Sequence, residues 1–196
     1  MVDETVPPDA ISALVEVPGA LPDLTNSHRV LIGGAKLEIL GVGPLDERDL
    51  DGIPPNDALF VASHVWALDT ATPLTLVASY SPTVRATAPF ATPAALVAMK
   101  LHAVQDRSAS AADKRAADAW DIYQLLVEHN GQGSISGALL SASTILKELV
   151  REAAEHVLVT GAARTVTWMR SGDLSMAAAT QEELRFLGER LIEALA

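Results

Sequence analysis

The chain has 196 residues and no cysteine, which excludes disulfide bonds and thiolate metal sites. Hydrophobic residues make up 49% of the chain and charged residues 20%, so the sequence predicts a folded core and excludes a wholly disordered protein. A net charge of −11 argues against a protein that coats nucleic acid, and the acidic start and short apolar runs predict a soluble, cytoplasmic protein without a membrane partner.

Two elements are expected in the first forty residues. Residues 8–18 predict a short helix, and residues 28–40 predict a β-hairpin because two apolar runs flank a pair of glycines. In the second run of this hairpin, Glu38 alternates with the apolar Leu37 and Ile39. The pattern alone therefore makes Glu38 a solvent-facing residue.

The middle of the chain carries a weaker pattern. Residues 41–58 are rich in glycine, proline and aspartate and predict a loop. Residues 59–90 alternate short apolar runs with proline and threonine, which favours further strands at Leu59–Ala62 and Leu74–Ser79.

From residue 92 onward the pattern becomes helical, beginning with Thr92 as an N-cap and Pro93 at the first helical position. A capping-box-like pattern at Ser110 and Asp113 indicates a second helix start. Four helices are expected: from Thr92 to about Arg107, from near Ser110 to Asn130, from Ser143 to Thr160, and from Thr180 to the last residue. We therefore divide the chain into a β-containing part, residues 1–91, and a helical region, residues 92–196.

Lys100 lies within the apolar stripe of its expected helix. Its neighbours three and four positions away are all apolar: Leu96, Val97, Ala103 and Val104. An ammonium placed there must reach solvent, pair with an acid or meet a ligand. Arg107 lies two turns along the same face, and Lys114 and Arg115 follow, so this basic segment of an acidic chain suits a site that grips phosphates.

Asp121 is the complementary case, because no cation lies three or four positions away from it on its helix. Two readings stay open. Lys100 and Asp121 pair only to fix helix packing, or Lys100 holds a triphosphate while Asp121 orients the lysine or the acceptor. Asp118 differs, since Lys114 and Arg115 lie one turn before it and ordinary surface pairing explains it.

The segments Ala94–Ala103 and Lys114–Leu126, with Arg107 between them, resemble the C-terminal signature of AbiEii-type nucleotidyltransferases of the DNA polymerase beta superfamily. The resemblance implies an α/β fold in which a partial nucleotidyltransferase mixed sheet precedes a helical C-terminal region. It implies a toxin of a toxin–antitoxin system that uses Mg²⁺ and transfers a nucleoside monophosphate from an NTP to an RNA such as the tRNA 3′ end. Lys100 and Arg107 would bind the nucleotide, and Asp121 would support catalysis.

The family's paired metal-binding aspartates can be placed in two ways. In the first, Glu38 is the third carboxylate of the metal site and the Asp-x-Asp pair would stand before Met1. In the second, Asp49 and Asp51 are the metal pair, but the prolines that follow at 54 and 55 prevent a central strand from continuing. We favour the first placement, under which this chain is weakly active or a remnant that binds nucleotide, RNA or protein.

Overall fold

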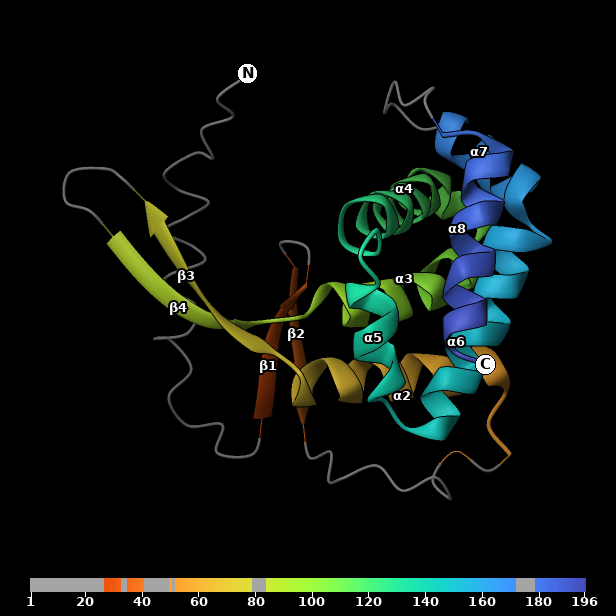
Figure 1. The fold of residues 1–196 in the computed structure, drawn as a ribbon. Coiled ribbons are helices and arrows are strands. Elements are labelled where there is room, and N and C mark those ends of the chain that lie inside the picture. The colour runs from red at the N-terminus through yellow and green to blue at the C-terminus, as the bar shows by residue number, and fades with distance from the viewer. Residues whose placement is uncertain (1–26, 33–34, 41–49, 51, 79–83, 172–178) are drawn as a thin grey trace.

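The computed structural model describes residues 27–32, 35–40, 50, 52–78, 84–171 and 179–196. A small sheet lies on one side of the molecule, and a group of packed helices lies on the other (Figure 1). The expectation of an α/β chain with a helical C-terminal region is therefore confirmed at this coarse level.

The sheet has four strands in the order β2-β1-β4-β3. Strands β1 (Ser27–Ile32) and β2 (Ala35–Leu40) are antiparallel, which confirms the predicted hairpin, and Glu38 lies opposite Arg29 in the register. Strands β3 (Thr72–Ala78) and β4 (Val84–Phe90) form a second antiparallel pair, which confirms the strand expected near residue 74. The two pairs join through a parallel contact between β1 and β4.

Helix α2 (Pro55–Asp69) corrects two predictions. Residues 59–62 are helical, so the strand expected there is wrong, and the loop expected up to residue 58 ends before Pro55. The buried positions of α2 follow helical spacing: Ala58, Leu59, Ala62, Ser63 and Ala67. An apolar run of four residues is too short to separate a strand from a buried helix, which explains the error.

The other helices are α3 (Pro93–Asp106), α4 (Ala112–His129), α5 (Ser134–Leu140), α6 (Thr144–Ala154), α7 (Ala162–Ser171) and α8 (Gln181–Ala194). A short 3-10 turn, η2 (Ala109–Ala111), precedes α4, and a π-helical turn, η3 (Glu155–Val159), extends α6.

Local capping explains where several of these helices begin. The Thr92 hydroxyl accepts from the Ala95 amide, as predicted for an N-cap, and Thr180, the predicted start of the last helix, forms a capping box with Glu183. The expected cap near Ser110 is wrong, because α4 begins after Ala111 without a side-chain cap.

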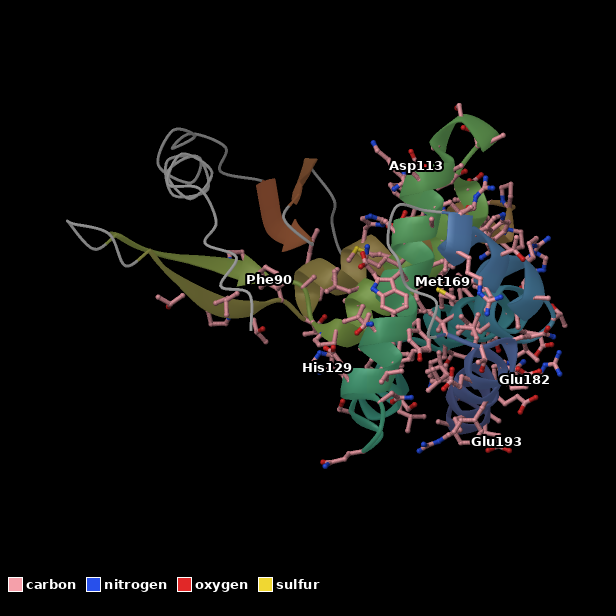
Figure 2. All side chains as sticks on the ribbon, turned by 90° about the horizontal axis from the view of Figure 1, so that it is seen from above. Phe90, Asp113, His129, Met169, Glu182 and Glu193 are labelled. Atoms are coloured by element: carbon pink, nitrogen blue, oxygen red, sulfur yellow. The ribbon has the colours of Figure 1, made fainter. Side chains whose placement is uncertain are left out.

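Helix α3 is the centre of the helical part and packs against α2, α4, α5 and α6. It is buried on most of its circumference, because four of its residues are alanines that allow close approach of neighbouring helices. Asp113 and His129 mark the two ends of α4, which lies alongside, and Phe90 marks the junction with the sheet (Figure 2). Trp66, Trp120 and Trp168 are partly buried against the core.

Some predictions fall outside the described residues. These are the helix expected over residues 8–18 and the acids Asp49 and Asp51. None of the helices in the described part of the chain is long and apolar enough to cross a bilayer.

Candidate functional site

Lys100 projects from the middle of α3 toward α4, and its side chain is 16% exposed. Its ammonium nitrogen lies 2.6 Å from Oδ2 of Asp121 and 3.1 Å from Oδ1 of Asp118. Both carboxylates belong to α4. The buried neighbours Val97 and Val104 agree with the apolar stripe seen in the sequence. The lysine is therefore paired across the helix interface, and two acids share it.

Asp118 is the centre of this arrangement, with a side chain only 12% exposed. Its second oxygen accepts from Nε of Arg107 at 3.1 Å, and Nη2 of Arg107 lies 3.1 Å from the same oxygen. The prediction that Asp118 pairs with Lys114 or Arg115 on the surface is wrong. We call Lys100, Arg107, Asp118 and Asp121 the Lys100 cluster.

The position of Asp118 follows from the helical repeat of α4. Ile122 and Leu126, four and eight residues later, are fully buried. Because residues at this spacing share one helix face, Asp118 must point into the interface where α3 lies. An acid placed four and eight residues before two core residues is the sequence signal that identifies the role of Asp118. The cations that lie near it in the sequence do not identify that role.

Electrostatics explains why the cluster holds together. Burial alone lowers the pKa of the Lys100 ammonium, but the hydrogen bond and charge of Asp121 and the charge of Asp118 outweigh it, so the pKa is raised. Two cations and two carboxylates make the cluster formally neutral. An ammonium has three donors, and described protein groups satisfy two of those of Lys100. The side chain of Asp121 is 48% exposed and marks the open side.

The residues predicted to hold metal, Glu38, Asp49 and Asp51, have side chains outside what the structure describes. The backbone of Glu38 lies in β2. Among the described residues, no group of three His, Asp or Glu side chains could hold a metal ion. Asp118 and Asp121 direct carboxylate oxygens at Lys100. These residues therefore do not form a magnesium site.

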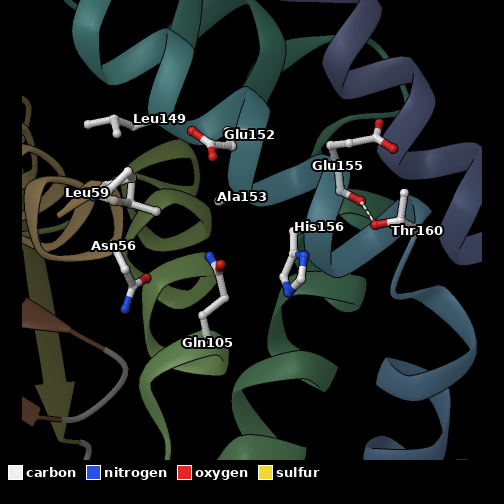
Figure 3. A pocket seen from close by; sticks show the side chains of 10 residues that line it. Asn56, Leu59, Gln105, Leu149, Glu152, Ala153, Glu155, His156 and Thr160 are labelled. Carbon is white, nitrogen blue, oxygen red and sulfur yellow. Dashed lines mark hydrogen bonds between the residues drawn. The ribbon is translucent and has the colours of Figure 1, made fainter.

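Two adjoining pockets lie elsewhere, with volumes of about 330 and 420 Å³. They share Asn56 of α2, Gln105 of α3 and His156 of η3, which line the first pocket together (Figure 3). No residue of the Lys100 cluster lines either one. Sequence reasoning missed these pockets, because their residues come from elements far apart in the chain.

The rings of His64 of α2 and His102 of α3 lie beside the ring of Phe60, a residue that is 45% exposed. The ring of Phe60 lies 4.2 Å from that of His64 and 5.0 Å from that of His102, measured between centroids. Burial lowers the pKa of both imidazoles. This pair is a packing feature, and its neutral form suits the fold.

Comparison with known proteins identifies no relative of this chain. No protein family, no curated protein and no solved structure matches the chain.

Proposed function

We propose that the Lys100 cluster binds the triphosphate of a nucleotide, and that the protein is a nucleotidyltransferase-like toxin. It would transfer a nucleoside monophosphate from an NTP to an RNA acceptor such as the tRNA 3′ end, and an antitoxin protein would restrain it. The observation that carries this proposal is the Lys100 ammonium, two of whose three donors are taken by described protein groups, one of them the half-exposed Asp121.

A triphosphate suits this ammonium for physical reasons. Lysine acts on phosphate as a compact charge with three donors, and a partly dehydrated ammonium interacts more strongly than one in bulk water. A phosphate oxygen can take the remaining donor or displace Asp121, whose exposed carboxylate can turn to solvent. Arg107, held by Asp118 at the end of α3, supplies a second cation on the same side.

The resemblance of these two helices to AbiEii-type nucleotidyltransferases supports the same reading. In our proposal, the mixed sheet that leads through β4 into α3 belongs to a nucleotidyltransferase core. Magnesium would arrive with the triphosphate. Because the described residues form no magnesium site, we assign no step to the metal.

A double variant separates ligand binding from packing. Replacing Lys100→Met together with Asp118→Leu removes the buried pair at once, and such apolar replacements commonly keep the fold. Arg107 and Asp121, with side chains 38% and 48% exposed, can turn to water. We expect calorimetric binding of the four NTPs, with magnesium present, to weaken by about tenfold or more.

The matched control is Lys147→Met, which removes a lysine of α6 that lies outside the Lys100 cluster. It should bind NTP as the unmodified protein does. A folded double variant that binds every NTP with unchanged affinity would show that Lys100 has only a packing role.

A non-catalytic module that binds nucleotide, RNA or protein is the second candidate. The formal neutrality of the cluster, in which both cations are already paired with carboxylates, favours it. Incubation with magnesium, labelled NTPs and tRNA distinguishes the two. Label transferred to the RNA 3′ end supports the enzyme, whereas retained nucleotide without transfer supports the module.

A further inference from the structure

The second of the two pockets is cationic. Its volume is about 420 Å³, and its charged side chains are two arginines, Arg115 of α4 and Arg164 of α7. No carboxylate lines it, although the chain has 25 acidic and 14 basic residues. We call it the arginine pocket, and its lining is Asn56, Val104, Gln105, Arg115, His156, Val157, Arg164 and Trp168.

Neither arginine has an acidic partner within the part of the chain that the structure describes. Arg164 donates through Nη2 to Nε2 of His156 at 3.1 Å, which requires that nitrogen to carry no proton. The guanidinium carbons of Arg115 and Arg164 lie 4.8 and 5.1 Å from the centre of the Trp168 ring. Contact with one indole holds both cations in place without neutralising them.

Two buried atoms in this pocket's lining residues also have no partner. Nε of Arg115 and Oδ1 of Asn56 are inaccessible to solvent and make no hydrogen bond. They are the two such side-chain atoms found on the described residues. Because buried polar groups nearly always have partners, both side chains can gain a hydrogen bond if they turn toward a polar group bound in the pocket.

We propose that the arginine pocket binds the phosphate group of a small hydroxylated molecule, as a phosphate monoester. Guanidinium groups present paired donors that match phosphate oxygens. The volume lies in the range of small-molecule sites. This site is distinct from the Lys100 cluster and shares no residue with it.

The adjoining pocket sets the chemistry of the rest of the ligand. It continues past Gln105 and His156 to Glu152, whose carboxylate points toward these side chains, whereas that of Glu155, also in the lining, points away (Figure 3). Carboxylates accept hydrogen bonds and repel further negative charge. The part of the ligand that extends there therefore carries hydroxyl donors and no second phosphate, as in a sugar phosphate.

Titration with inorganic phosphate and with ribose 5-phosphate tests this site. Ionic strength is held constant with sodium chloride, and binding is followed by calorimetry and by the indole N–H resonance of Trp168, assigned with Trp168→Phe. We expect saturable binding that weakens by about tenfold or more in Arg115→Gln and in Arg164→Gln, because each loses a charge-assisted contact. Tighter binding of ribose 5-phosphate identifies a sugar phosphate as the source, and equal affinity identifies free phosphate.

Arg185→Gln is the matched control, because Arg185 is an exposed arginine on α8 outside the pocket lining. It should bind as the unmodified protein does, and so should the Lys100→Met, Asp118→Leu variant. That second result keeps this test independent of the proposed NTP site. No saturable binding to the unmodified protein, or unchanged affinity in both pocket variants, would overturn the proposal.

Discussion

The Lys100 cluster and the arginine pocket each contain two cations, yet their surroundings are opposite. In the cluster, Asp118 and Asp121 balance both charges. In the pocket, an indole and an imidazole hold Arg115 and Arg164, and no carboxylate lines the wall. One basic segment of the sequence therefore contributes cations to two different kinds of site. Balanced cations stabilise helix packing before any ligand binds, whereas unbalanced cations are retained at a cost that a bound anion can offset.

The largest expected effect is on the cluster. Asp118→Ala leaves Arg107 without its carboxylate and Lys100 with one of two, so the free energy of unfolding should fall by about 3 kcal/mol. Urea denaturation measures this change. A loss below about 1 kcal/mol would mean that the cluster does not stabilise the interface of α3 and α4, which would remove the contrast with the arginine pocket.

Gly188→Ala tests how the arginine pocket depends on packing behind η3. A Cβ at residue 188 would lie 2.7 Å from Cβ of Leu158 and 2.9 Å from Cγ2 of Val159. Overpacking of this kind costs about 1–3 kcal/mol. Because η3 also carries His156, phosphate binding should weaken as well. The Lys100 cluster should keep its NTP affinity, and parallel titrations with both ligands check this difference.

Lowering the pH should destabilise the fold through the histidine pair, His64 and His102. The pKa values of His64 and His102 are lowered in the fold, so below the ordinary value of 6.5 the unfolded chain binds more protons than the folded one. Stability should therefore fall as pH drops from 7 through 6. Thermal melts of His102→Gln should show a weaker pH dependence. An identical slope in the variant would exclude His102 as a cause.

The smallest expected effect is on stability at the arginine pocket. Arg115→Gln and Arg164→Gln each remove a contact with Trp168 and no ion pair, so unfolding free energy should change by less than about 1 kcal/mol. Compared with the loss expected for Asp118→Ala, these melts show whether the pocket arginines stabilise the fold less than the Lys100 cluster does. A loss near that of Asp118→Ala would make the pocket arginines structural.

Much of the fold was predictable where local chemistry decides it. The hairpin follows from apolar runs around a glycine pair, and the starts of α3 and α8 follow from Thr92 and Thr180, whose hydroxyls cap the helix ends. Helix α2 was missed because its apolar run at residues 59–62 fits a strand equally well.

The sites were harder to predict because they depend on contacts between distant elements. Lys100 was found from its apolar neighbours, but Asp118 was assigned to the nearest cations in sequence, whereas its partners come from α3. The arginine pocket joins α2, α3, α4, η3 and α7, and no local pattern brings these together. The role expected of Glu38 stays a prediction.

The geometry of the arginine pocket depends on the number of residues in the π-helical turn η3. Its amide-to-carbonyl bond from Thr160 to Glu155 spans five residues and is 2.9 Å long, one residue more than an α-helix uses. Removing a single residue there would restore the ordinary repeat and rotate the following segment by about 100° relative to α6. Arg164 and Trp168 would then face another direction, so the pocket's charge depends on one additional residue in the chain.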